Sequence, residues 1–277
     1  MSIDQLKSYG VRQMTQLETD VDRFREEIVI KGFTVVPDVV PESELEEARN
    51  RIDAVYAAQA KEIGGEDNLR KINDALVGRC LMAYDDYFLS FATNPKIHAV
   101  VGSLLGEYFT ILQQNAVINA PSDKHFQTSW HRDLAYQHFV SSRPLALSAL
   151  FCIDNFSEAT GGTYMLPGSH KIEPFPSSEF IAGNEQTVNA KAGCALVFDS
   201  MVYHRGGNNR SKGLRRGVNH LFGLPFIKQQ ISFPRSLGGK YRREPSLSRF
   251  LGYDTEAAES VLQWRTNRLE RLSDPFA

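Results

Sequence analysis

The sequence predicts a mainly β fold with flanking helices: a double-stranded β-helix, or cupin-like jelly roll, with helices at both ends of the chain. Two observations indicate this fold class. Helical spacing dominates the first third, and from Ile111 onward short extended runs follow one another between turns. Several short strands at such intervals are typical of a sandwich or jelly roll, and the helices are then expected to pack outside it.

The first part of the chain, up to about residue 110, is predicted to be a mixed helical support region. A first helix is expected near 17–29, and the β-branched segment 32–40 is typical of a strand. Residues 95–106 predict a further helix. Between the strand and this helix, after Pro41, five apolar residues recur at helical spacing and predict a helix with one buried stripe: Leu45, Ala48, Ile52, Val55 and Ala58.

The jelly-roll core is expected over about 111–225, where glycine pairs break the extended runs. The predicted strands cover 111–119, 145–153, 195–198 and 218–224. Beyond it, about 226–277 is expected to be an irregular, basic extension that ends in a helix near 255–272. The sequence has no internal repeat and no Pro/Gly/Ser linker, so 1–277 is expected to be a single domain.

Composition excludes several classes of partner. The 31 Lys and Arg residues against 33 Asp and Glu give a net charge of -2, so no global field favours nucleic acid or an anionic membrane. The first residues lack the apolar region of a secretory signal, and no apolar run is long enough for a membrane span. We therefore expect a cytoplasmic monomer or homodimer that acts on a small-molecule substrate, with no nucleic-acid or membrane partner.

The three cysteines are Cys80, Cys152 and Cys194. They are widely separated and show no CxxC spacing, which argues against a disulfide framework and against a cysteine zinc site. We expect them to be small core residues.

The pair His131 and Asp133 is the first pointer to chemistry. The surrounding segment 126–139 is aromatic and lacks Gly and Pro, which favours a strand over a helix. Residues at i and i+2 of a strand project to the same side, so both side chains can bind one metal while Arg132 points away. With a second imidazole they would form the facial triad of non-heme Fe(II) oxygenases, which leaves positions free for cosubstrate and O2.

His204 can supply that second imidazole. It follows the apolar run 194–198, at the end of a strand or in the next turn. The alternative is a surface histidine beside a glycine turn. Farther along, Arg215 or Arg216 can bind a carboxylate with its guanidinium fork. Because neighbouring residues of a strand face opposite sides, only one of the two can enter the barrel.

Six segments carry a family resemblance. They are GFTVVPDVVPESELEEAR at 32–49, Ile118-Asn119, WHRD at 130–133, GGTYMLPGSH at 161–170, and FDSMVYH at 198–204 with NNRSKGLR at 208–215. The match that they define, from 32 to 215, spans most of the chain, and the PGSH turn with the eleven-residue step from His204 to Arg215 is specific in combination. The sequence resembles the phytanoyl-CoA dioxygenase-like Fe(II)/2-oxoglutarate oxygenases, which include ectoine hydroxylases.

The resemblance implies a metal site in which His131, Asp133 and His204 hold Fe(II). It also implies that Arg215, rather than Arg216, binds the distal carboxylate of 2-oxoglutarate, and that Asn119 lies near this cosubstrate. Two positions depart from relatives: Ala120 stands where some carry Lys, and Gly206 where some carry Ser. They leave the secondary contacts to 2-oxoglutarate open.

The expected reaction is hydroxylation of an unactivated C–H bond of a small metabolite, with O2 as oxidant and release of succinate and CO2. Related halogenases have a small residue in place of Asp133, so the carboxylate favours hydroxylation over halogenation. Desaturation or cyclisation at the same iron centre is an alternative. Two alternatives are not enzymes. One is a noncatalytic jelly-roll protein that binds a small molecule or sugar, and the other is a structural or regulatory protein whose basic C-terminal segment contacts anions.

Several further residues have weaker expectations. His170 in the PGSH turn is expected to be structural rather than a fourth ligand, and Trp130 is expected to pack in the core or on a sheet face. The C-terminal arginines fit an anionic substrate or a solvated face equally well. Candidate residues of the substrate pocket are Gln127, Tyr136, His138 and Phe151.

Overall fold

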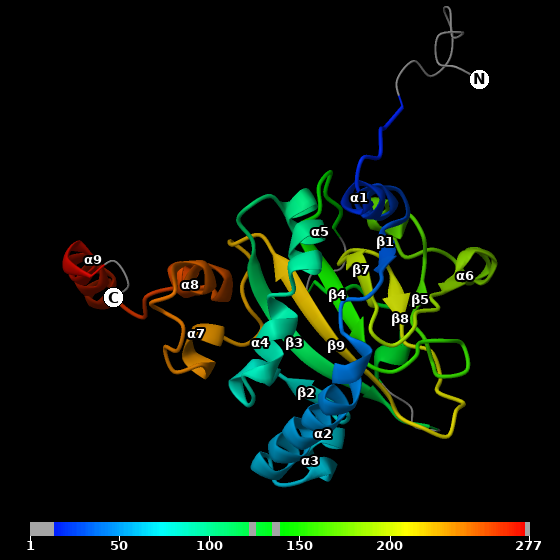
Figure 1. Ribbon diagram of the computed structural model, residues 1–277, viewed down its shortest axis with the longest axis horizontal. Helices are drawn as coiled ribbons and strands as arrows, with labels where there is room; N and C mark the ends of the chain where they lie inside the picture. Colours follow the sequence, from blue (N-terminus) through cyan, green and yellow to red (C-terminus); the bar gives the residue numbers. More distant parts are fainter. Residues whose placement is uncertain (1–13, 122–125, 135–138, 275–277) are drawn as a thin grey trace, which may run out of the picture.

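Two antiparallel sheets form the centre of the protein (Figure 1). The structure, a computed structural model, describes residues 14–121, 126–134 and 139–274. The larger sheet has the strand order β1-β7-β4-β9-β3-β2, and the smaller one β6-β5-β8. The strands are β1 Phe33–Val36, β2 Val77–Arg79, β3 Thr110–Asn119, β4 Ala146–Cys152, β5 Tyr164–Met165, β6 Gln186–Thr187, β7 Ala195–Asp199, β8 His204–Arg205 and β9 Arg215–Gly223. The predicted jelly roll is confirmed.

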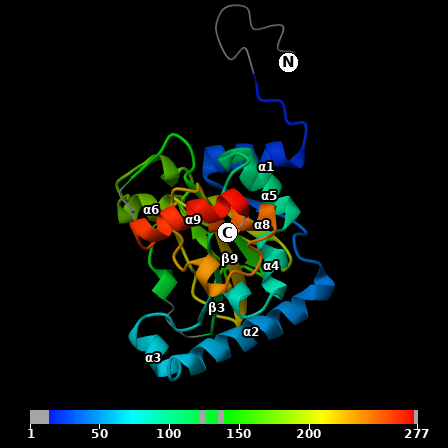
Figure 2. The same cartoon turned by 90° about the vertical axis from the view of Figure 1, so that its left-hand side faces the viewer.

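Helices surround these sheets (Figures 1 and 2). They are α1 Asp20–Lys31, α2 Leu45–Glu62, α3 Glu66–Lys71, α4 Tyr87–Ala92, α5 Pro95–Leu105, α6 Ser178–Asn184, α7 Phe233–Ser236, α8 Pro245–Leu251 and α9 Val261–Ser273. The largest core cluster lies between the larger sheet and helices α1, α2, α4, α5 and α8. Helix α9 lies at one end of the molecule and buries no residue. Among the described helices, none is long and apolar enough to cross a membrane.

The N-terminal elements follow local signals in the sequence. Thr19 caps α1 in a capping box, and Gly32 ends this helix in the left-handed conformation, so that β1 begins at the next residue. The predicted helix after Pro41 is confirmed as α2, with four of its five apolar positions buried. Ala58 is exposed, because the apolar stripe ends with Val55.

The strand predicted over 126–139 is wrong for the residues that the structure describes. A short 3-10 helix covers Phe126–Thr128, and His131 forms only an isolated bridge with His204. The backbone leaves the ladder after one pair because the amide of Asp133 donates to Ser200 instead. Residues 135–138 lie outside the described part of the chain.

The C-terminal extension is more regular than predicted. Ser232 caps α7 with its hydroxyl, Pro245 begins α8, and Ser260 caps α9, which therefore starts at Val261 instead of near 255. Three of its basic residues form surface ion pairs: Arg235 with Glu256 and Glu259, Lys240 with Asp86, and Arg243 with Asp274. A solvated face thus explains part of the positive charge.

Candidate metal centre

The backbone brings His131, Asp133 and His204 together. His131 and His204 each donate an amide N–H to the carbonyl of the other, at 3.0 Å in both directions. Two residues farther on, the amide of Asp133 donates to the carbonyl of Ser200 at 3.0 Å. This bridge joins the start of β8 to a segment that has no strand of its own. It thereby fixes both histidines beside the aspartate.

The three side chains converge on one point. One donor atom from each, two imidazole nitrogens and one carboxylate oxygen, all lie within 4.8 Å of one another. Oδ1 of Asp133 lies 3.3 Å from Nε2 of His204 and 3.9 Å from Nε2 of His131. Among the described residues, this is the one group of His, Cys, Asp or Glu that could hold a metal ion.

Hydrogen bonds orient both imidazoles for metal binding. Nδ1 of His131 lies 2.8 Å from the carbonyl of Ser129, and Nδ1 of His204 lies 3.0 Å from that of Val202. A carbonyl can only accept, so each Nδ1 carries the proton and each Nε2 keeps its lone pair. Both lone pairs are on the side of Asp133. This donor set fits a divalent cation such as Fe(II).

The charges of the cluster fit a cation as well. Burial and the neighbouring His204 lower the pKa of His131 to about 4, so its imidazole is neutral, as a metal ligand must be. Burial opposes charge on His204 and Asp133, but their mutual attraction prevails. It raises the pKa of His204 and holds the pKa of Asp133 well below its usual range. The carboxylate of Asp133 therefore stays ionised, as a metal ligand must be.

Arg215 presents a buried positive charge near the cluster. It is 4% exposed, its Nη2 donates to the carbonyl of Gly161 at 2.9 Å, and its guanidinium lies 4.3 Å from the ring centroid of Phe156. Burial lowers the pKa of Arg215 to about 10. Its Nε has no hydrogen-bond partner, and none of the described carboxylates forms an ion pair with it. A buried cation in this state is suited to an anionic ligand.

Arg216 points to the opposite face of β9. Its guanidinium forms ion pairs with Asp53 at 2.8 Å and with Asp154 at 3.2 Å. The prediction that only one of the two arginines enters the barrel is confirmed, because the alternation of β9 separates them.

Asn119 ties together the two glycine turns next to Arg215. Its Nδ2 donates to the carbonyl of Gly207 at 2.8 Å and to that of Gly161 at 3.4 Å. Gly161 has φ +75°, and a Cβ there would lie 2.5 Å from Nδ2 of Asn119. Glycine is therefore required at this position. A contact between Asn119 and a cosubstrate stays a prediction.

A small cavity adjoins the cluster and Arg215. The residues that line it are Val117, Gln127, His131, Asp133, Leu150, Thr163, Phe198, His204, Gly206, Arg215 and Asn219. Sequence reasoning missed Thr163, Asn219 and the apolar wall. Asn219 could have been found, because a residue four positions after Arg215 in a strand shares its face.

Of the four predicted pocket residues, Gln127 lines this cavity and Phe151 does not. Phe151 is fully buried on the helix side of β4, with its ring centroid 5.5 Å from that of Phe91 and 4.9 Å from that of His220. The prediction for Phe151 is wrong because the strand alternation turns it away from the cavity. Tyr136 and His138 lie outside the described residues.

His170 and Trp130 have the structural roles that were predicted. Nε2 of His170 lies 3.2 Å from the carbonyl of Val29 in α1, and His170 is not part of the metal-binding group. Trp130 packs beside Tyr203 in a small apolar cluster. Both residues support the site from outside.

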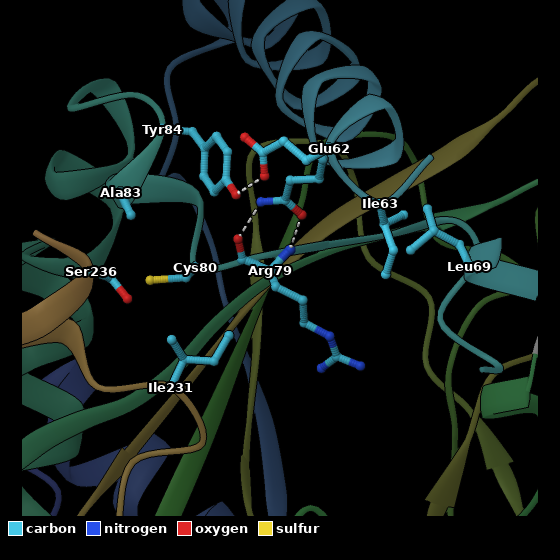
Figure 3. A pocket seen from close by; sticks show the side chains of 10 residues that line it. Glu62, Ile63, Leu69, Arg79, Cys80, Ala83, Tyr84, Ile231 and Ser236 are labelled. Carbon is cyan, nitrogen blue, oxygen red and sulfur yellow. Dashed lines mark hydrogen bonds between the residues drawn. The ribbon is translucent and has the colours of Figure 1, made fainter. Parts of the chain in front are cut away.

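A larger cavity of about 620 Å³ lies elsewhere, between α2, β2 and the segment before α7 (Figure 3). It shares no lining residue with the cavity at the metal-binding group. The Tyr84 hydroxyl donates to Glu62, and the Gln59 side chain pairs with both backbone groups of Arg79. These polar groups satisfy one another, so this cavity offers no comparable chemistry.

Comparison with known proteins gives a family match and related folds. The family described as phytanoyl-CoA dioxygenase (PhyH) matches residues 30–217. An uncharacterized protein of Mycobacterium tuberculosis is 33% identical over 226 residues, which are 79% of this chain and 81% of that protein.

Two solved structures have a similar fold. One is EctD from S. alaskensis with 2-oxoglutarate and 5-hydroxyectoine, at 19% identity and a TM-score of 0.61, covering 73% of this chain and 75% of that one. The other is the epimerase SnoN with Fe3+, alpha ketoglutarate and nogalamycin RO, at 18% identity and a TM-score of 0.60, covering 74% and 84%.

Proposed function

The chain belongs to the phytanoyl-CoA dioxygenase family, and on this premise we propose that it is an Fe(II)- and 2-oxoglutarate-dependent dioxygenase that hydroxylates a C–H bond of a small molecule. The observation that carries the proposal is the convergence of His131, Asp133 and His204 beside the buried, unpaired charge of Arg215. Iron and 2-oxoglutarate occur together in the structure of SnoN, and 2-oxoglutarate occurs with 5-hydroxyectoine in that of EctD.

Different residues would bind the metal and the cosubstrate. The two Nε2 atoms and Oδ1 of Asp133 would hold Fe(II) from one side, and Arg215 would bind the distal carboxylate of 2-oxoglutarate. When bound, the iron supplies the oxidation by O2 that converts 2-oxoglutarate to succinate and CO2 and oxidises the substrate. The apolar side chains of Leu150 and Phe198 would keep water from the cavity.

Hydroxylation is the reaction that Asp133 favours, since a carboxylate at this position occupies the place that a halide needs. The epimerase SnoN has the same fold, so a likeness of fold alone does not determine the outcome. A noncatalytic binding protein has no need of a metal triad together with an anchoring arginine.

The test is a screen of small metabolites with the iron-loaded protein, read as succinate formed and O2 consumed. A hydroxylase is expected to form succinate only with both Fe(II) and 2-oxoglutarate, and to place one 18O atom from 18O2 in the product. His131→Ala should abolish succinate formation, whereas His170→Gln, which changes a histidine outside the cluster, should retain it. Full activity of His131→Ala would exclude the proposal.

A further inference from the structure

We infer that Ser148 and Asn219 position Asp133, so that one of its carboxylate oxygens is held by the protein and the other is presented to the metal. The inference rests on the proposed function, because it assigns a task to residues around the proposed iron ligands. It concerns two residues that neither the motif nor its spacing indicates. Neither side chain is itself one of the candidate ligands.

The two oxygens of Asp133 have different surroundings. Oδ2 accepts a hydrogen bond from Oγ of Ser148 at 2.5 Å and a longer one from Nδ2 of Asn219 at 3.4 Å. Oδ1 is the oxygen nearest to Nε2 of both histidines. With Oδ2 occupied from two directions, rotation of the carboxylate toward bidentate metal binding would break both hydrogen bonds. The arrangement thus favours a single oxygen ligand.

Ser148 is well placed to act as a fixed donor. It lies in β4, between β7 and β9, and is fully buried. Its Oγ also lies 3.2 Å from Oγ of Ser200, another fully buried residue. Because a carboxylate can only accept, the proton of Ser148 points to Asp133, and Ser200 must donate to Ser148. Hydrogen bonds are therefore donated in one direction, from Ser200 to Ser148 and from Ser148 to Asp133.

Asn219 is oriented by the same reasoning. Its amide nitrogen must face Asp133, which turns Oδ1 of Asn219 away from the carboxylate. That oxygen is buried and has no hydrogen-bond partner among the described residues. An apolar residue here would avoid the cost of a buried, unpaired acceptor. The amide is explained if its nitrogen donates to Asp133 and its oxygen accepts a hydrogen bond from a bound molecule.

Hydrogen bonds to a ligating carboxylate typically change metal affinity by about 10- to 100-fold. The test is a titration of the metal-free protein with Co(II), followed by visible absorption, in which both affinity and coordination are read. We expect Ser148→Ala to bind Co(II) about 10- to 100-fold more weakly than the wild type and with a changed absorption spectrum. Ser248→Ala, which alters a buried serine of α8, should match the wild type.

The outcomes distinguish failure of the positioning role from failure of the proposed function. Unchanged Co(II) affinity and an unchanged spectrum in Ser148→Ala would overturn the positioning role while leaving the proposed function intact. A wild-type protein that does not bind one equivalent of Co(II) would overturn both. If Ser148→Ala does not fold, Asn219→Ala decides: a weaker Co(II) complex in this variant supports the inference, and wild-type affinity contradicts it.

Discussion

Nε2 of His204 lies 3.3 Å from Oδ1 of Asp133, although the two residues belong to distant parts of the sequence. The contact exists because His131, two residues before Asp133, shares a β-bridge with His204. A single backbone pair thus sets the geometry of three side chains. Their Nδ1 partners leave two nitrogen lone pairs and one carboxylate oxygen for a cation.

Arg215 and Arg216 offer a matched pair of variants. Arg215→Leu is expected to raise the KM for 2-oxoglutarate roughly 100-fold, since the ligand loses a buried, charge-assisted contact. Arg216→Leu should leave this KM unchanged and lower the melting temperature, because it breaks the ion pairs with Asp53 and Asp154. Steady-state rates of succinate formation measure the first effect. An equal rise of KM in both variants would refute the assignment of Arg215.

Gly161 is expected to tolerate no side chain. In Gly161→Ala the new Cβ would meet Nδ2 of Asn119 at 2.5 Å and the carbonyl of Gly207 at 2.6 Å, in addition to the strain of a positive φ. We expect a loss of about 3 kcal/mol in the free energy of unfolding. Gly168 is the control, because it has the same φ of +75° and no atom near the added Cβ. Gly168→Ala should cost about 1 kcal/mol. Urea unfolding that gives equal losses would contradict this explanation.

His170 should contribute to a loss of stability in mild acid, together with the other buried histidines whose pKa values are lowered. Burial lowers the pKa of His170 to about 4, below its value of 6.5 in the unfolded chain. Between these two pH values the unfolded state binds more protons, so the free energy of unfolding decreases as the pH falls from about 6.5 to 4. His170→Gln should reduce this decrease by about 2 kcal/mol.

The measurement is urea unfolding at pH 7 and pH 4.5, with a chelator present so that metal binding does not contribute. A variant that loses as much stability in acid as the wild type would show that His170 is not responsible.

Asn219 predicts a property of the substrate. Asn219 lines the cavity, and its buried Oδ1, which has no partner among the described residues, can only accept a hydrogen bond. The carboxylates of 2-oxoglutarate are acceptors too, so they cannot donate to this oxygen. We therefore expect substrates found in the screen to carry an O–H or N–H group. At saturating Fe(II), Asn219→Leu should raise the KM for such a substrate more than the KM for an analogue without that group. A substrate without any donor that is used equally well by both proteins would contradict this expectation.

The sequence predicted the periodic elements, and singled out the three side chains that converge, better than it predicted the local path of the chain. Helix α2 and strands β3, β4 and β7 have strong apolar patterns, and their bounds agree with prediction to within a few residues. The aromatic residues around His131 favour a strand, so the sequence alone predicts one there. Strand pairing there stops after one bridge, which no local pattern reveals.

Part of the site was out of reach from sequence alone. Ser148 is one serine in an apolar strand, and its role depends on Asp133 approaching from a different segment. Arg215 was separated from Arg216 by family resemblance, since the phase of β9 is set by its pairing with β3 and β4. Short strands such as β2, β5 and β6 carry too few residues to show a period.

The central claim is that His131, Asp133 and His204 hold Fe(II) next to a 2-oxoglutarate site at Arg215. The most direct measurement is anaerobic addition of Fe(II) and then 2-oxoglutarate to the metal-free protein, followed by the visible charge-transfer absorption of an Fe(II)–2-oxo acid chelate. We expect one equivalent of Fe(II) to produce this absorption in the wild type, none in His131→Ala, and a response in Arg215→Leu only at much higher 2-oxoglutarate. Wild-type absorption in His131→Ala, or none in the wild type, would contradict the claim.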